Sequence, residues 1–478
     1  MNSIHKPLSL FGLLLLVAGQ LLPQIDFSVV NVALKLMGQT LHTAETGLIL
    51  IVALYALCFS TLIATGARLG DRYGRKRIFL LGILGFSFAS VICGASHHIL
   101  AMLAGRALQG LFAALLTPQI LSTIHATLSG ERHSRAVSIY ISVAGLSVAF
   151  GQMMGGWIVS ANLFNLSWRT AFFINIPICL IILFVGYFFI PETKADIKPK
   201  MDIPGIFLFA GAMLCLLIPI TLGHHWPVLF LLLPCLIPFS VYLIRYEKRL
   251  EKQGGNPLIP PSLFMTNNAR TGLLTEIAVT LTYSGYLFVT AVYLQKALNF
   301  TPLQSGNTFM YLGITGFIGS LLSERVSQRW GDRRTFILGA IATSLGFLTT
   351  IGLFWICKQT ITIPYIMIGT GLIGLGNLFM LNSAFKLTLS NVNKHHASEA
   401  SGALVTVQQG FFALGTALTG TIYSIMSSYG HLIAVTTAIS VLVIIVFSVA
   451  IIVLRQILRE KKQKIQINSD IPCTENIH

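Results

Sequence analysis

The sequence predicts an all-α integral membrane protein of fourteen transmembrane helices, arranged as two six-helix bundles with a two-helix insert between them. Three observations lead to this fold class: an apolar composition, the number of apolar segments long enough to cross a bilayer, and a motif that recurs in the second half of the chain. The expected boundaries are 1–192 for the first bundle, 193–246 for the insert, 247–270 for a cytoplasmic linker, 271–455 for the second bundle and 456–478 for a cytoplasmic tail without regular structure.

The composition is that of a protein surrounded by lipid. Hydrophobic residues make up 54% of the 478 residues and charged residues only 10%, and the mean hydropathy is +0.77. A soluble domain carries about 25% charged residues, so this chain cannot cover its surface with polar groups. The seven cysteines are scattered without paired spacing, which predicts neither a disulfide framework nor a metal site.

Fourteen segments are candidates for membrane spans, since a helix needs roughly 20 apolar residues to cross the hydrocarbon core. The first apolar stretch starts at Leu8 and continues to Val32 without a small-residue cleavage site, so we interpret it as a span and not as a signal peptide. The seventh and eighth segments contain prolines, which membrane helices tolerate. The expected spans are 8–32, 46–66, 78–96, 99–121, 136–159, 169–190, 203–223, 227–245, 271–294, 305–323, 335–356, 362–385, 401–426 and 431–455.

The basic residues predict the orientation of these spans. With both termini placed in the cytoplasm, 27 of the 32 lysines and arginines fall on the cytoplasmic side, which is the bias that membrane proteins show. The net charge of +16 is then explained by loops that face anionic lipid headgroups, and not by binding to nucleic acid. The five exceptions are Lys35, Arg169, Lys296 and Lys358 on the outer side and Arg106 within a span.

An internal repeat relates the two halves of the chain. The segments 68–82 and 325–339 match at seven of fifteen positions with an offset of 257, and each would link two spans on the cytoplasmic side. Internal duplication is typical of secondary transporters, whose substrate site lies between the repeats. The chain has no G-x-x-x-x-G-K-[ST] phosphate loop, which argues against an ATP-driven pump, and it shows no convergent set of catalytic groups that a membrane enzyme would need.

Five motifs carry a resemblance to a known family. The loop 67–77 reads Ala-Arg-Leu-Gly-Asp-Arg-Tyr-Gly-Arg-Lys-Arg, and span 4 carries Arg-Ala-Leu-Gln-Gly over 106–110. Span 5 carries Gly-Gln-Met-Met-Gly-Gly over 151–156, span 1 carries Asp-Phe-Ser-Val-Val-Asn-Val-Ala over 26–33, and Trp-Arg-x-x-Phe-x-Ile-Asn-x-Pro covers 168–177. Together, and in their order along the chain, they resemble the major facilitator superfamily in its fourteen-span drug:proton antiporter branch.

The sequence departs from the pattern of that branch at four positions. Ala67 replaces the first glycine of the loop, Gln152 replaces the proline of the antiporter motif, and Lys35 replaces the proline that follows the first motif. In the second copy of the loop, Gln328 stands where the first copy has Asp71. The change at Gln152 weakens that motif as an indication of export.

Three charged residues within the spans are candidates for proton coupling: Asp26, Arg106 and Glu276. A charged group in the bilayer is costly and indicates function by default. Asp26 and Arg106 lie at similar depth from the outer end of their spans, so we expect a pair in which Asp26 binds and releases a proton while Arg106 sets its affinity. The alternative is an ion pair that only fixes helix packing. Glu276 is expected to bind a cation or a second proton, or else to extend to the cytoplasm and pair with Arg270.

The duplicated loop is interpreted as a cytoplasmic gate. A carboxylate there can lie at a helix N-terminus across the interface between the halves, where the helix dipole favours an anion. A basic turn that only obeys the orientation bias explains the lysine and arginines, but not the single acidic residue among them. The residues assigned to this gate are Asp71, Arg72, Gly74, Arg75, Arg329 and Gly331.

Span 5 and several mid-span side chains are assigned to packing and to the substrate cavity. The small residues Gly151, Gly155 and Gly156, with Gln152 among them, would let this helix approach a neighbour closely. Mid-span polar and aromatic side chains are candidates for lining a central cavity, although most aromatic residues in membrane helices serve packing. The cavity candidates are Asn31, Gln109, Tyr283, Tyr286, Asn307, Tyr311, Asn382, Gln408 and Phe412.

The resemblance implies a transporter and no enzyme. It implies a monomer in the plasma (bacterial inner) membrane that exports small lipophilic or cationic drugs by antiport, with the proton gradient as driving force and no cofactor. Its partners would be the solute, protons and the lipid bilayer, with a periplasmic adaptor protein left open. The alternatives are dedicated export of an endogenous metabolite such as a siderophore, proton symport, and a transport-dead sensor or structural protein.

Overall fold

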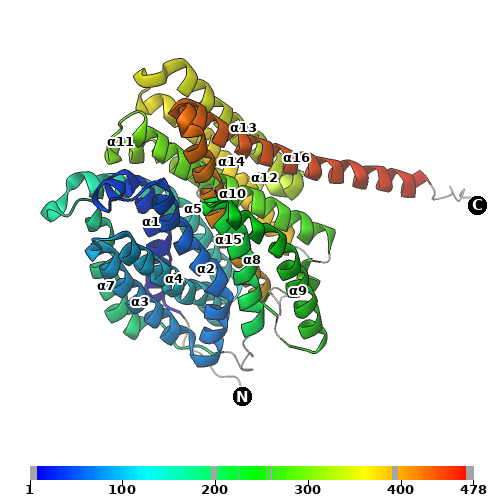
Figure 1. The fold of residues 1–478 in the computed structure, drawn as a ribbon. Helices are drawn as coiled ribbons and strands as arrows, with labels where there is room; N and C mark the ends of the chain where they lie inside the picture. Colours follow the sequence, from blue (N-terminus) through cyan, green and yellow to red (C-terminus); the bar gives the residue numbers. More distant parts are fainter. Residues whose placement is uncertain are drawn as a thin grey trace, which may run out of the picture.

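The computed structural model describes residues 8–194, 202–223, 226–255, 257–258, 261–264, 266–389 and 397–469, and these residues form helices and connecting loops without a β-strand (Figure 1). Short 3₁₀ segments connect several of the helices. The α-helices are α1 Leu10–Thr40, α2 Glu45–Tyr73, α3 Arg75–Ala95, α4 Ile99–Thr127, α5 Gly130–Ala161, α6 Thr170–Phe173, α7 Asn175–Phe189, α8 Ile203–Leu222, α9 Leu233–Lys252, α10 Asn267–Lys296, α11 Pro302–Asn307, α12 Met310–Trp330, α13 Asp332–Cys357, α14 Ile363–Leu389, α15 Ala397–Met426 and α16 His431–Ser469.

The predicted all-helical membrane fold is confirmed. Within the described part of the chain, eleven helical segments are long and apolar enough to cross a bilayer. The three expected spans outside this set fall on α5, α12 and α15. In α12, glycines, serines and a Glu-Arg pair dilute the apolar side chains. The count of fourteen therefore stays a prediction.

The duplicated loop has the same backbone form in both halves. Gly74 separates α2 from α3, and Gly331 separates α12 from α13. Both glycines have positive φ angles, 116° and 85°, which glycine adopts without the steric penalty that other residues pay. The offset of 257 in the sequence thus corresponds to one helix–glycine–helix turn that occurs twice.

The insert packs against both halves. Its first helix, α8, contacts α2 of the first half and α15 of the second, while α9 packs on α8 (Figure 1). The Thr421 hydroxyl of α15 donates a hydrogen bond to the Ile220 carbonyl of α8 at 2.7 Å. Phe209, Leu243 and Leu258 form a small apolar cluster that joins the insert to the linker.

The linker and the tail differ from expectation. The expected linker begins at residue 247, but α9 continues to Lys252, and α10 already begins at Asn267. The tail was expected to lack regular structure from 456 onward, whereas α16 continues to Ser469 and extends away from the other helices (Figure 1). Residues 470–478 lie outside the described residues, as do the basic positions 195–200 and 394 that contributed to the orientation argument.

Candidate functional site

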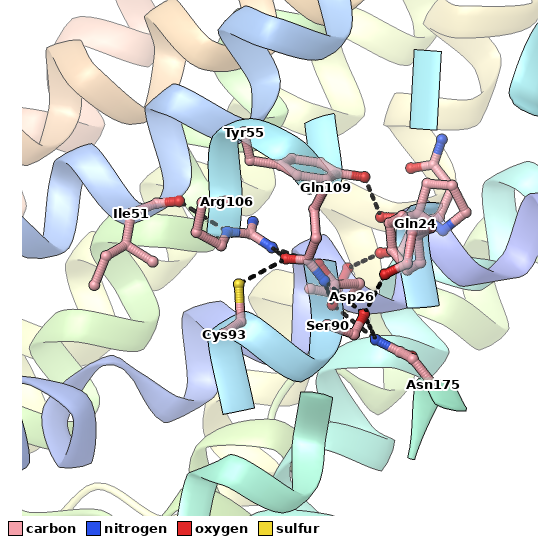
Figure 2. Close-up of polar contacts among 12 residues, drawn as sticks. Gln24, Asp26, Ile51, Tyr55, Ser90, Cys93, Arg106, Gln109 and Asn175 are labelled. Atoms are coloured by element: carbon pink, nitrogen blue, oxygen red, sulfur yellow. Dashed lines mark hydrogen bonds and ion pairs between the residues drawn. The ribbon is translucent and has the colours of Figure 1, made fainter. Parts of the chain in front are cut away.

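Asp26 lies at the centre of a buried polar cluster in the first half of the chain. Its side chain, on α1, is almost fully buried and accepts three hydrogen bonds (Figure 2). Arg106 Nη1 donates to Oδ2 at 2.5 Å, while Gln109 Nε2 and Asn175 Nδ2 donate to Oδ1 at 3.1 and 3.0 Å. The contact expected between Asp26 and Arg106 is therefore present, and Gln109 belongs to this cluster.

Arg106 is fixed by groups from three helices. Its Nε donates to the Ile51 carbonyl of α2 at 3.0 Å, and its Nη1 also donates to Gln109 Oε1 at 2.8 Å. The guanidinium carbon lies 4.2 Å from the centre of the Tyr55 ring, a cation–π distance (Figure 2). The Tyr55 hydroxyl in turn donates to the Pro23 carbonyl at 3.0 Å, so this ring connects Arg106 to α1.

Tyr55 and Ser90 were not predicted from the sequence, and Asn175 was named there only as part of the motif 168–177 and not as a site residue. The Ser90 hydroxyl accepts hydrogen bonds from Gln109 at 2.9 Å and from Asn175 at 3.3 Å. Both residues are uncharged, so a search for charges within the spans passes over them. The expected span 78–96 places Ser90 six residues from its outer end, the same depth as Asp26 in 8–32, and this comparison could have identified it.

The cluster suits an ionised carboxylate. Three N–H donors point at Asp26, and a carboxylate can accept all of them, whereas a protonated acid has one O–H of its own and less acceptor capacity. Arg106 keeps its charge in any protein environment. Adding a proton to Asp26 would therefore leave a buried guanidinium without its counter-ion, which is a strongly unfavourable arrangement unless the surrounding helices move.

Glu276 occupies a different place in the fold. It lies on α10 of the second half and is completely buried. Among the described residues neither carboxylate oxygen has a hydrogen bond of good geometry, and the side chain of Gln408 on α15 lies within reach of the carboxylate. The expectation that Glu276 extends to the surface and bonds Arg270 is wrong for this conformation, because a side chain that reached the cytoplasm would be exposed.

The Asp71 loop does not make the contact expected of it. Asp71 accepts from Arg75 Nε at 2.9 Å and Nη2 at 2.7 Å, so its partner lies in the same loop and not across the interface. Arg72 lies over the neighbouring Tyr73 ring, 5.4 Å from its centre. The prediction placed Asp71 at a helix of the other half, but Arg75, four residues further along the chain, bonds it instead.

The second copy of the loop is held by other residues. Lys386 Nζ of α14 donates to Glu324 Oε2 of α12 at 2.6 Å, while the assigned residue Arg329 is exposed. In the first copy, Arg68 Nη2 donates to the Pro257 carbonyl at 2.6 Å and joins this loop to the linker.

The glycines of α5 lie at two close helix contacts. A Cβ on Gly151 would come within 2.8 Å of Ser28, and one on Gly155 within 2.8 Å of the Val29 Cα, both on α1. A Cβ on Gly156 would lie 2.6 Å from the Pro302 carbonyl of α11, which belongs to the second half. The motif therefore packs α5 against its own half and, through Gly156, against the other.

Gln152 is fully buried beside this contact. Its backbone carbonyl is the atom that a Cβ on Gly306 of α11 would approach, to 2.5 Å. Among the described residues neither its side-chain oxygen nor its nitrogen has a hydrogen-bond partner.

Two of the cavity candidates, Tyr283 and Phe412, contact each other in the second half at a place where it meets the first. Phe412 of α15 packs edge-to-face on Tyr283 of α10, with ring centres 6.3 Å apart, and on Phe27 of α1 at 4.8 Å. Gln408 lies one turn before Phe412 on α15. Asn31, one turn after Phe27, is buried and its amide has no partner in the described part of the chain.

The remaining candidates lie elsewhere. The Tyr286 hydroxyl bonds Thr350 at 3.2 Å inside the second half, and Asn382 Nδ2 donates to Ser323 at 2.5 Å in the same half. Asn307 accepts from the Trp157 indole at 3.2 Å, at the contact of α11 with α5. Tyr311 is 45% exposed and begins an exposed apolar stripe with Ile314, Ile318 and Leu321, the pattern of a lipid-facing surface.

Polar contacts join the two halves at the end of the bundle that the basic residues assign to the outside. Lys35 Nζ of α1 donates to the Gln295 carbonyl at 2.6 Å and to Asn299 Oδ1 at 3.2 Å. Glu45 of α2 and Lys296 of α10 form an ion pair at 2.7 Å. These contacts and the contact of α5 with α11 close this end.

A sequence profile of the Major Facilitator Superfamily matches residues 16–416 and 272–470. The chain belongs to this superfamily. It is similar to a probable actinorhodin transporter of Streptomyces coelicolor, with 31% identity over 85% of this chain and 71% of that protein. It is also similar to the puromycin resistance protein of Streptomyces alboniger, with 30% identity over 86% and 81%. The tetracenomycin C resistance and export protein of Streptomyces glaucescens is 28% identical over 85% and 74%.

Solved structures of the superfamily share the fold. A POT family transporter in complex with a thioalcohol-conjugated peptide matches with a TM-score of 0.67, at 12% identity over 92% of this chain and 96% of that chain. A bacterial homologue of the human lysosomal transporter Spinster, inward-facing and unoccupied, matches with a TM-score of 0.66, at 16% identity over 94% and 97%. This chain is therefore an integral membrane transporter and not an enzyme.

Proposed function

We propose that this transporter exports small lipophilic or cationic drugs or toxins from the cell, in exchange for protons, across the plasma (bacterial inner) membrane. The observation that carries the proposal is Asp26, an acid buried in a membrane bundle and bonded by Arg106, Gln109 and Asn175. The relatives named for antibiotic export and resistance support the direction of transport. The chain works as a monomer without a cofactor, and both termini lie in the cytoplasm.

The geometry supports a simple coupling scheme. With Asp26 ionised, Arg106 is neutralised and the observed packing is stable. A proton that reaches Asp26 from the outside removes the counter-ion of Arg106, and the helices α1, α2 and α4 then rearrange around it. The two halves then rotate relative to one another, and the proton leaves toward the cytoplasm when the ion pair forms again.

The closed outer end agrees with a state that loads substrate from the cytoplasm. Lys35, Glu45 and Lys296 hold that end together, so a solute could reach the middle only from the opposite side. An exporter requires such a state, because its substrate starts in the cytoplasm.

The proposal is tested by efflux of ethidium and of puromycin from cells that express the wild type or Asp26→Asn, with and without a protonophore. We expect the wild type to lower the intracellular concentration of at least one of the two compounds, and both the protonophore and the substitution to abolish that difference. Efflux that persists in Asp26→Asn and still depends on the proton gradient would contradict the role of Asp26. Membrane insertion of both proteins is checked by fluorescence of a C-terminal fusion.

Dedicated export of one compound is the second candidate. It is favoured by relatives that are named for single compounds, namely actinorhodin, puromycin and tetracenomycin C. Dedicated export would be supported if the wild-type protein is present in the membrane and moves neither probe, yet lets protons enter when extracts of the native host are added.

A further inference from the structure

A continuous series of ring contacts connects the Asp26 cluster to the second half of the protein. The guanidinium of Arg106 lies over Tyr55, and the Tyr55 ring contacts Phe27 with centres 6.3 Å apart. Phe27 packs edge-to-face on Phe412 at 4.8 Å, and Phe412 contacts Tyr283 at 6.3 Å. The series starts on α4 and α2, passes through α1, and crosses to α15 and α10.

The first link responds to the charge of Asp26. The guanidinium of Arg106 has two main attractions, the carboxylate at 2.5 Å and the face of the Tyr55 ring. When Asp26 is neutral, the attraction between its carboxyl group and the guanidinium is weakened, and the guanidinium depends more on its other partners. Its Nη2 has no partner among the described residues. Any shift of the guanidinium moves the ring against which it packs.

The second link is the segment of α1 around Pro23. Proline has no backbone N–H, so α1 lacks one helical hydrogen bond in this turn and bends there more easily. The Tyr55 hydroxyl bonds the Pro23 carbonyl at 3.0 Å, just one turn before Phe27. A movement of Tyr55 is therefore passed to the part of α1 that carries both Asp26 and Phe27.

The third link is the edge-to-face pair of Phe27 and Phe412. It lies between the halves, and the two rings are tilted by 79° with centres 4.8 Å apart, which is a favourable geometry for aromatic pairs. Phe412 is only partly buried, so it is not a fixed core residue and can change its contact. Its second partner, Tyr283, belongs to the same helix as Glu276.

We propose that Phe412 is the residue that transmits the protonation state of Asp26 to the second half, by keeping or losing its contact with Phe27. This inference rests on the proposed role of Asp26. Phe412 is a positioning residue, since it bonds neither the proton nor Arg106. While Asp26 is ionised, the Phe27–Phe412 contact holds α15 against α1; after protonation, the shift of Tyr55 and of α1 separates the rings and releases α15.

The titratable groups that face Asp26 come from four helices. They are Arg106 on α4, Tyr55 on α2, Cys93 on α3 and Cys179 on α7, among the residues that the structure describes. Cys93 and Cys179 are replaced in the spin-labelled protein, Arg106 stays charged, and the Tyr55 phenol has no second proton to gain, so a response to acid that depends on this cluster is assigned to Asp26.

The test measures conformation, so it does not depend on a known substrate. Spin labels are placed at Leu163 and Gln359, exposed positions on outer loops of the first and second half, in a protein whose other cysteines are replaced. Distance distributions are recorded at acidic and alkaline pH in lipid nanodiscs. We expect the wild type to shift toward longer outer distances at acidic pH, and Asp26→Asn to give the same distribution at both pH values.

The measured quantity is the ratio of molecules with an open outer end to molecules with a closed one. Phe412→Ala should reduce the change of this ratio with pH by about three- to tenfold, which corresponds to the free energy of one aromatic pair. Phe412→Tyr keeps the ring and should keep the shift. Phe411→Ala is the matched control, because Phe411 is the neighbouring ring, is also partly buried, and makes no ring contact in the described part of the chain. If Phe412→Ala does not fold, Phe412→Leu keeps most of the volume without the ring.

The outcomes separate the two proposals. A wild type that shows no pH-dependent shift would overturn proton coupling at Asp26, and the present inference with it. A wild type that shifts, together with a Phe412→Ala protein that shifts as much as Phe411→Ala, would overturn the role of Phe412 alone.

Discussion

Gly156 of α5 lies against Gly306 of α11, with no room for a side chain on either residue. A Cβ on Gly156 would be 2.6 Å from the Pro302 carbonyl and 3.3 Å from the Gly306 Cα. Because α5 belongs to the first half and α11 to the second, this contact joins the halves at the end that the basic residues assign to the outside. The two glycines thus define how near the halves come.

The first prediction concerns this contact. Gly156→Ala should destabilise the closed outer end by about 1–3 kcal/mol, the usual cost of overpacking, and should make outer cysteine labels more accessible. Gly352→Ala is the control, because a Cβ on this helical glycine of α13 would meet nothing within 4 Å. It should leave accessibility unchanged. Equal labelling rates in both variants would show that the contact does not limit closure.

The second prediction separates the fold from the mechanism at the buried ion pair. Arg106→Gln leaves the Asp26 carboxylate without a counter-ion and should destabilise the protein by about 3–5 kcal/mol. Adding Asp26→Asn should recover most of this loss without restoring proton-driven efflux. Thermal unfolding in detergent measures the first effect and dye efflux the second. The exposed pair Arg135–Glu131, treated in the same way, should show a coupling of no more than about 0.5 kcal/mol.

The contact between Asp26 and Arg106 could be predicted because charges within apolar spans are rare and their depths can be compared. The same method missed Tyr55 and Ser90, which are uncharged and are identified only once the helices are placed together. The repeat could also be predicted, because Gly74 and Gly331 stand at matching positions of the two segments. Each turn needs a positive φ angle at this position, which favours glycine, so the requirement is visible in the sequence.

The errors arose where several partners were available. Asp71 was assigned a partner in the other half, although Arg75 lies four residues away and bonds it. Of the two alternatives for Glu276, the contact with Arg270 is not found because the side chain is completely buried, and the cation or proton site stays a prediction. Tyr311 was placed in the cavity because periodicity alone does not tell which apolar face of a membrane helix meets lipid and which meets protein.

The third prediction concerns the ion pair of Glu45 and Lys296, in which each side chain is about one-quarter exposed. Glu45→Lys should favour the open outer end about two- to fivefold, since partly exposed pairs contribute roughly 0.2–1 kcal/mol. The double reversal with Lys296→Glu should restore the original ratio, and high salt should weaken both effects. Spin-label distances across the outer end measure this. Reversal of Glu324 and Lys386, a pair within the second half, should have no such effect.

The fourth prediction concerns the buried amide of Gln152, which replaces the proline usual in this motif. Gln152→Met removes two polar groups that have no partner in the described part of the chain, and should stabilise this conformation by about 1–3 kcal/mol. The unfolding temperature should rise and transport should slow, because the closed outer end becomes harder to leave. Gln119→Met should have the opposite effect on stability, since Gln119 Nε2 donates to the carbonyls of Gly66 and Leu115. A drop in stability for Gln152→Met would indicate that its amide is bonded in this state.

The fifth prediction distinguishes Glu276 from Asp26. Glu276→Gln keeps the shape of a buried side chain that makes no hydrogen bond of good geometry among the described residues and can still contact Gln408, so the unfolding temperature should not fall, in contrast to Arg106→Gln. If Glu276 holds a cation, export of ethidium should drop about tenfold, the loss expected for one charged contact, while export of neutral chloramphenicol should remain. Both rates are measured in everted vesicles under the same proton gradient. An equal loss for both compounds would instead assign Glu276 to proton transfer, because a group that carries the driving ion affects every substrate alike.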